Sequence, residues 1–215
     1  IVVFTDTSIT CQAPAGTSGT SVDVVVTNDN GTATLTSAFT YYAAPTLSAV
    51  APGTGTPLGG TAITLTGTGF QANGAGTNTV TFAGLAATSV VVVNDTTITC
   101  ATPAGTSGST VDVVVANVNG TATLVGGFVY HATPTVTAVS PVSGTSLGGT
   151  TVTVTGTGFQ NDSPGTNVVT FGGTSATGVS VVNDTTLTCT TPARSAGAVV
   201  DLVVSNDNGV ATLVT

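Results

Sequence analysis

The sequence predicts an all-β protein built from tandem antiparallel β-sandwiches, and three observations predict this fold class. The segment 59–70 returns nearly unchanged as 148–159, a shift of 89 positions that marks an internal repeat. Within this segment apolar residues alternate with threonines, which is the period-two pattern of a half-buried strand. Turn residues recur at intervals of about 8 to 12 residues, and no helical period appears.

The repeated segment predicts the central strand of each copy. Ile63 and Leu65 are separated by threonines, so one face of the strand is apolar and the other is polar. A glycine pair precedes the strand, and Gly67 and Gly69 follow it. Glycines at these places break the strand before and after its alternating part.

The one complete copy contains seven or eight expected strands. Its first strand lies between Pro45 and Pro52, which suits a sheet edge, where proline is tolerated. A polar loop at 71–78 follows the central strand. The expected strands are 46–50, 61–66, 79–82, 89–93, 97–100, 111–115, 121–124 and 128–130.

The clearest local prediction is a β-hairpin near the end of each copy. Two alternating apolar segments flank a turn that ends in Asn-Gly, the strongest short-range hairpin signal. The three turns are 28–31, 117–120 and 206–209.

The repeat predicts three domains. Residues 1–43 carry the C-terminal part of a first domain, residues 44–131 form a complete domain, and residues 132–215 form a third domain that lacks its last strand. Either a longer tandem array or a neighbouring subunit supplies the missing strands, since an unpaired edge is a template for an added strand. The linkers are short and contain Pro45 and Pro134, which restrict the backbone. We therefore expect a rod-like array.

Charge excludes several classes of partner. The chain has one basic residue, Arg194, against nine aspartates, and its net charge is -8. Nucleic-acid binding draws its affinity largely from Lys and Arg, so no nucleic-acid partner is expected. A basic membrane-docking face is excluded for the same reason, and no apolar segment approaches the length of a membrane span.

Several segments of the third copy carry a family resemblance. They are 134–141, Ser143-Gly144, Gly148-Gly149, 153–159, 169–173 and 186–193. These segments resemble the IPT/TIG (immunoglobulin-like, plexin, transcription factor) domains of the bacterial surface type, and the resemblance covers the whole chain. It implies tandem immunoglobulin-like β-sandwiches that serve as spacer, adhesion or starch-enzyme accessory domains. The DNA-contacting members of the family depend on basic loops that this chain lacks.

The sequence offers no catalytic constellation. Asp23, Asp112 and Asp201 recur within an apolar strand, where an outward carboxylate is the ordinary interpretation. A nucleophile triad requires histidine, and the one histidine, His131, lies at a repeat junction. The prediction is therefore a non-enzymatic protein without catalytic or cofactor-binding residues.

The cysteines are predicted to be free, buried thiols. Cys11, Cys100 and Cys189 occupy equivalent positions, so no domain has two thiols with which to form a disulfide. Each lies two residues after an apolar strand residue and shares its face, which is typical of a buried small hydrophobe.

Two weaker candidates concern ligands and sugars. Asp162 and Asp207 are expected at the same pole of the third domain, where acidic loops could bind calcium, although the middle copy has no carboxylate there. An isopeptide cross-link is excluded because the chain has no lysine. Five asparagines begin Asn-x-Ser/Thr triplets in expected turns and are candidate glycosylation sites: Asn30, Asn94, Asn119, Asn161 and Asn183.

Outward valines are a further candidate surface. Val91 and Val93 alternate with Val90 and Val92, so one of the two sets must face outward. The same argument applies to the positions of Val25, Val114 and Val203. Repeated along a rod, such residues form an apolar stripe that suits lateral association, unless a sheet edge or linker covers them.

These observations together predict a non-enzymatic, extracellular or cell-surface repeat protein that forms the shaft of a fibre, filament or adhesin. Its expected partners are further copies of itself or adjacent repeats of a longer chain. The alternatives are a carbohydrate-binding or spacer module of a secreted polysaccharide-active enzyme, and a phage tail-fibre component.

Overall fold

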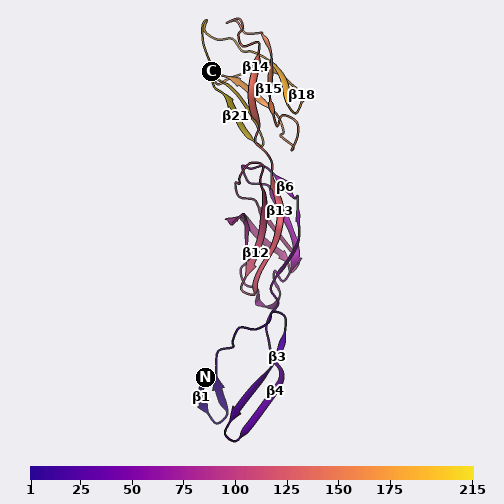
Figure 1. The fold of residues 1–215 in the computed structure, drawn as a ribbon, viewed down its shortest axis with the longest axis vertical. Helices are drawn as coiled ribbons and strands as arrows, with labels where there is room; N and C mark the ends of the chain where they lie inside the picture. Colours follow the sequence, from indigo (N-terminus) through magenta and orange to yellow (C-terminus); the bar gives the residue numbers. More distant parts are fainter.

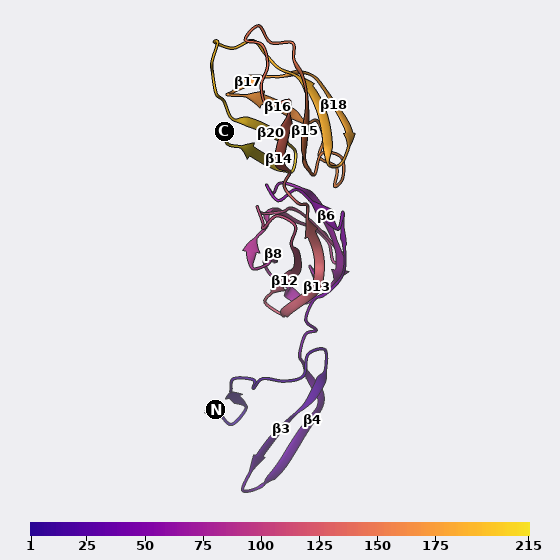
Figure 2. The same cartoon turned by 45° about the horizontal axis from the view of Figure 1, so that its top comes forward.

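The computed structural model describes residues 1–215, which form three modules stacked end to end along one long axis (Figure 1). The first module comprises β1 to β4, the second β5 to β13, and the third β14 to β21. The N-terminus lies in the module at one end of the stack and the C-terminus in the module at the other. A short linker without regular secondary structure connects each module to the next (Figure 2).

The first module consists of two separate antiparallel ribbons. They pair β1 (Val2–Thr5) with β2 (Ser8–Thr10), and β3 (Ser21–Asn28) with β4 (Gly31–Thr40). No second sheet covers either ribbon within residues 1–43, and the strand residues are exposed. Cys11, which follows β2, is therefore exposed, and the prediction of a buried thiol is wrong at this position.

The second module is a sandwich of two sheets. The first sheet has the order β10-β11-β7-β5 and the second β6-β13-β12-β8-β9. All neighbours are antiparallel except β6, which runs parallel to β13. The bounds are β5 Thr46–Ala51, β6 Thr54–Gly55, β7 Ala62–Thr68, β8 Thr79–Phe82, β9 Leu85–Ala86, β10 Thr88–Asn94, β11 Thr97–Ala101, β12 Thr110–Asn117 and β13 Gly120–Tyr130.

The third module repeats this architecture. Its sheets have the orders β14-β15-β19-β18 and β17-β16-β20-β21. The bounds are β14 Thr135–Ser140, β15 Thr151–Thr157, β16 Val168–Phe171, β17 Thr174–Ser175, β18 Thr177–Asn183, β19 Thr186–Thr190, β20 Leu202–Asn206 and β21 Gly209–Leu213. The predicted all-β class of tandem immunoglobulin-like sandwiches is confirmed.

The alternation predicted from the sequence builds the core of each sandwich. In β7, Ile63 and Leu65 are buried while the threonines between them are exposed. The opposite sheet contributes Phe82 and Phe128, whose rings meet edge to face with centroids 5.3 Å apart. The buried apolar face of the central strands β7, β11 and β12 therefore points between the sheets and fixes the register of these strands.

Three details were not predicted from the sequence. The expected strands 121–124 and 128–130 form one strand, β13, with an irregular register opposite Asp112. The two-residue strands β6 and β9 extend the second sheet. The loop after β7 contains a short 3-10 turn at Ala72–Gly74. No helix in the chain is long and apolar enough to cross a bilayer.

Candidate functional site

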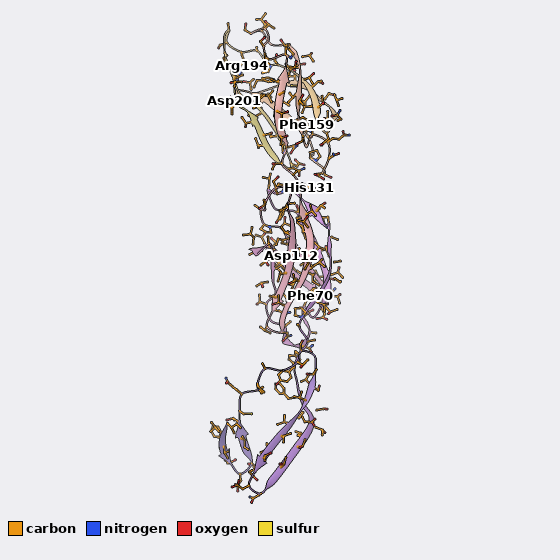
Figure 3. All side chains as sticks on the ribbon, in the orientation of Figure 1. Phe70, Asp112, His131, Phe159, Arg194 and Asp201 are labelled. Atoms are coloured by element: carbon orange, nitrogen blue, oxygen red, sulfur yellow. The ribbon has the colours of Figure 1, made fainter.

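The junction between the second and third modules is the candidate functional site. His131 lies at the boundary between the two sandwiches, as Figure 3 shows. Its Nδ1 is 3.2 Å from Oδ1 of Asn208 in the β20–β21 turn. Beside it, the Thr56 hydroxyl donates to the carbonyl oxygen of Asp207 at 2.7 Å. Two hydrogen bonds thus join side chains of the second module, Thr56 and His131, to the hairpin tip of the third.

The hydrogen-bond partners of Asn208 determine the tautomer of His131. The Asn208 amide donates through Nδ2 to the Asp162 carbonyl at 2.9 Å, so its Oδ1 must be the acceptor that faces His131. Nδ1 of His131 therefore carries the hydrogen. Asn208 is 2% exposed, and its side-chain amide meets the expectation that a buried polar group has hydrogen-bond partners.

Buried and half-buried asparagines hold the hairpin tip in place. Asn206 donates through Nδ2 to the Gly158 carbonyl and to Oδ1 of Asn167, at 2.9 and 3.1 Å. Asn167 in turn donates to the Phe159 carbonyl at 2.7 Å. Asn117 and Asn78 make the same bonds in the second module. The pole that meets the preceding module is therefore preorganised within its own sandwich.

Each linker is bound to the module that precedes it. Ser107 Oγ accepts a hydrogen bond from the Thr133 backbone N–H at 2.7 Å, and Ser18 Oγ accepts one from Ala44 at 2.8 Å. The backbone of His131 also donates to the Gly55 carbonyl at 2.8 Å. These bonds fix the linker residues that precede Pro45 and Pro134.

The linker also packs against the hairpin tip of the following module. Gly209 has a φ of 142°, and a Cβ at this position would lie 2.8 Å from Cγ2 of Thr133. Gly120 has the same relation to Cβ of Ala44. Only glycine allows the tip to approach the linker this closely.

Two aspartates fix the loop that follows the central strand. Asp184 Oδ1 accepts hydrogen bonds from the backbone N–H groups of Asn161 and Gln160 at 2.8 and 3.1 Å. These bonds, the one from Asn161 foremost, lower the pKa of Asp184 below its ordinary value. In the second module, Asp95 has its pKa lowered in the same way by the N–H groups of Ala72 and Gln71.

The recurring aspartates of the hairpin strand have a structural contact. Asp112 Oδ1 accepts from the Gly126 backbone N–H at 2.8 Å, where β13 is irregular opposite β12. Asp23 and Asp201 accept from the equivalent residues Ser37 and Thr215. Asp23 and Asp112 thus bind a backbone donor at a bulge of the hairpin, and Asp201 binds the equivalent donor just beyond the end of β21.

The other two cysteines lie in the cores of the sandwiches. Cys100 and Cys189 are buried, and burial raises the pKa of each thiol to about 11. Thiolates are the reactive form of cysteine, so both side chains are inert hydrophobes in the folded protein.

The calcium candidates lie at one pole, but the structure gives them few ligands. Both Asp162 and Asp207 lie near the hairpin tip: the Asp162 carbonyl accepts a hydrogen bond from Asn208, and the Asp207 carboxylate lies beside Gly165. No group of three or more His, Cys, Asp or Glu side chains is arranged to hold a metal anywhere in the chain. Calcium binding stays a prediction.

The candidate glycosylation sites differ in their contacts. Asn94 and Asn183 accept hydrogen bonds from both the backbone N–H and the hydroxyl of the threonine two residues later. Asn119 donates to the Asn73 carbonyl at 3.3 Å. For Asn30 and Asn161 only backbone N–H bonds are present. Glycosylation at these positions stays a prediction.

The predicted alternation of the valines is confirmed in the second module. Val91 and Val93 of β10 are 54% and 56% exposed, while Val90 and Val92 pack against the core. Val182, at the position of Val93 in the third module, is 60% exposed.

Arg194 departs from the repeat. It stands where the other modules have Gly16 and Gly105, against which the rings of Tyr41 and Tyr130 pack. Nη2 of Arg194 donates to the carbonyls of Phe171 and Gly172. The side chain borders a cavity of about 440 Å³ at the pole far from the second module.

Sequence patterns placed His131 at the junction but did not single out the other residues that build it. Thr56, Ser18 and Ser107 lie in a chain so rich in Thr and Ser that their positions carry no signal. Asp95 and Asp184 lie between expected strands, and no local pattern indicates their contacts with the loop. Their equivalent positions in successive copies were the one available hint.

The chain is similar to several solved structures. Among solved structures, the chain resembles the plexin A4 extracellular region, with 24% identity over 85% of this chain and 16% of that chain and a TM-score of 0.41. It resembles SGBP-B from a complex xyloglucan utilization locus in Bacteroides uniformis, with 25% identity over 79% and 48% of the two chains and a TM-score of 0.34. For the I9–I11 tandem of titin the identity is 9% over 98% and 86%, with a TM-score of 0.40.

The chain thus spans about a sixth of the plexin ectodomain and about half of the Bacteroides protein. No curated protein matches it significantly. The model of the IPT/TIG domain matches residues 1–41, 45–131 and 134–215. Three successive matches account for nearly the entire length, and the chain therefore belongs to the IPT/TIG domain family.

Proposed function

We propose that the chain is a structural, non-enzymatic part of an extracellular repeat protein and forms the shaft of a cell-surface fibre, filament or adhesin. The junction between the second and third modules is the observation that carries this proposal. There a hairpin tip is bonded to the preceding module through Thr56 and His131 and is packed against the linker. A shaft must hold its tip at a distance, and this requires modules that keep a fixed mutual orientation.

The composition supports a role outside the cell. A single basic residue, Arg194, leaves trypsin-like proteases one cleavage point in 215 residues. Backbone hydrogen bonds connect the strands of four- and five-stranded sheets in the two sandwiches. Both features suit a protein exposed to proteases and to mechanical load.

We further propose that copies associate side by side through the exposed valines of β10 and β18. These two strands carry no charged residue, whereas the chain as a whole has a net charge of -8. Two copies can therefore meet along them without bringing carboxylates together. Exposed apolar side chains repeated along a rod suit this contact.

Electron microscopy of native material tests the proposed function. We expect straight rods or filaments whose axial period corresponds to one module. Discrete particles without filaments would contradict the fibre, and particles that bind polysaccharide would favour a spacer or carbohydrate-binding module instead.

A further inference from the structure

The three hairpin turns each end in Asn-Gly, a dipeptide that can modify itself. The backbone nitrogen of the glycine attacks Cγ of the asparagine, a C–N bond forms, and the Cγ–Nδ2 bond breaks with release of ammonia. Water then opens the succinimide ring to aspartate or isoaspartate. The dipeptides are Asn30-Gly31, Asn119-Gly120 and Asn208-Gly209.

Close packing against the linker requires the glycine of each reactive dipeptide. Gly120 and Gly209 have φ values of 143° and 142°, and a side chain at either position would collide with the linker. Because no other residue fits there, the chain cannot remove the hazard by replacing the glycine. Protection, where it exists, must come from the asparagine's surroundings.

Asn119 and Asn208 provide a matched pair. The backbone N–H of each donates to the Oδ1 of the asparagine two residues earlier, at 3.0 Å in both cases. Nδ2 of each donates to a carbonyl in the neighbouring loop, at 3.3 Å for Asn119 and 2.9 Å for Asn208. The two turns therefore share their backbone pairing and their contacts within the module.

The junction makes the difference between the two asparagines. Oδ1 of Asn208 is bound by Nδ1 of His131 from the preceding module, and the side chain is 2% exposed. Oδ1 of Asn119 has no partner, and Asn119 is partly exposed. The equivalent of His131 at the first junction is Tyr42, which is 52% exposed.

We propose that Asn119-Gly120 is a site of spontaneous deamidation and that docking of the second module onto the third protects Asn208-Gly209 from the same reaction. Attack requires Cγ to turn toward the glycine nitrogen. At Asn208 this movement must first break the bond to His131, whereas at Asn119 no such bond exists. The proposal rests on the docked junction described above.

The modification has a consequence for the first junction. Aspartate at 119 cannot donate to the Asn73 carbonyl, and it places a negative charge beside that oxygen. Isoaspartate also lengthens the backbone at the hairpin tip that faces the first module. The first junction therefore changes with age while the second keeps its neutral amide.

Peptide mapping of the aged 215-residue protein tests the proposal. The protein is incubated at mildly alkaline pH in heavy-oxygen water, digested with chymotrypsin, and followed by mass spectrometry at both turns. We expect deamidation at Asn119 to be about ten-fold faster than at Asn208, the factor that one additional hydrogen bond and burial provide. Equal rates at the two turns would overturn the proposal.

A His131→Ala variant separates the role of the junction from that of the third module itself. We expect deamidation at Asn208 to accelerate toward the rate at Asn119, while Asn119 itself is unchanged and serves as the internal control. Thermal unfolding of the variant confirms that both sandwiches remain folded. If Asn208 stays slow in this variant, its protection comes from Asp162 within its own module, and the inference fails even if the junction proves stiff.

Discussion

Asp95 and Asp184 illustrate how a single side chain fixes a whole loop. Each carboxylate accepts several backbone N–H groups of the loop that follows the central strand. The equivalent residue of the first module, Asp6, has no such loop beside it within residues 1–43. The same residue type at the same position of the repeat thus has different partners, and only the structure distinguishes them.

We expect the double variant Asp95→Asn/Asp184→Asn to unfold at lower temperature than the unmodified protein at neutral pH. The folded pKa of each group is lowered, so its stabilising effect is complete above the ordinary value of 3.8 and is lost as pH falls through the lowered pKa. The difference in melting temperature should therefore shrink in acid. Melting curves across this pH range measure it, with Asp6→Asn as the control, and a difference that persists unchanged in acid would contradict the assignment.

The three thiols should differ in reactivity. Cys11 is exposed, whereas Cys100 and Cys189 are buried and their pKa values are raised to about 11. In the native protein we expect a thiol reagent to modify Cys11 alone, and in denaturant all three. Mass spectrometry after labelling counts the modified thiols. Rapid labelling of a second thiol in the native protein would show that a sandwich core is open.

At the scale of secondary-structure elements, the glycine near the end of each central strand, Gly67 in β7 and Gly156 in β15, contacts a neighbouring strand closely. A Cβ on Gly67 would collide with the Thr46 carbonyl and with the Phe70 ring, so the glycine allows β5 and the Phe70 side chain to approach β7. Gly156 has the same role in the third module. The sequence analysis placed a break at this glycine, but β7 continues to Thr68. The glycine is required instead by a contact between two strands.

Gly67→Ala should therefore destabilise the second module by about 1 to 3 kcal/mol, the usual cost of overpacking a core. Gly53→Ala is the matched control, because the nearest atom to a Cβ at Gly53 is 3.8 Å away. Its effect should stay within about 0.5 kcal/mol. Urea unfolding of the two variants compares them, and equal stabilities would argue against the close approach at Gly67.

Sequence patterns predicted most of the elements for a physical reason. Alternation such as that of Ile63 and Leu65 indicates which face of a strand is buried. Asn-Gly indicates a turn because both residues readily adopt the backbone conformation that a tight hairpin needs. By contrast, the strand β6 and the bond from Thr56 to Asp207 depend on residues far apart in the sequence. Such contacts leave no local pattern, and the junction was therefore predicted only as a place, through His131 and the prolines.

At the scale of the whole molecule, the proposed lateral contact predicts a charge effect. Lysine at Val93 and Val182 would place a charge on each exposed strand, which opposes the burial of that surface between copies. We expect this double variant to sediment as monomers under conditions in which the unmodified protein associates. Val125→Lys is the control, because Val125 is 80% exposed on the opposite sheet. Equal association of all three proteins would exclude the valines as the contact.

The stack of modules depends on how rigidly the second sandwich holds the third. The linker contacts of Ser107 and Thr133 and the two bonds between modules act on the same few residues. A hinge motion would have to break them together. The stiffness of the shaft is therefore a property of the junction and can be measured in the isolated chain.

Pulsed electron-spin resonance measures this stiffness most directly. Spin labels are placed on Val125→Cys and Val199→Cys, which lie on the second and third modules at exposed positions, in a Cys11→Ala background. The rigid junction predicts one narrow distribution of distances, which broadens when Thr56 and His131 are both replaced by alanine. A broad distribution in the protein with the intact junction would contradict the account.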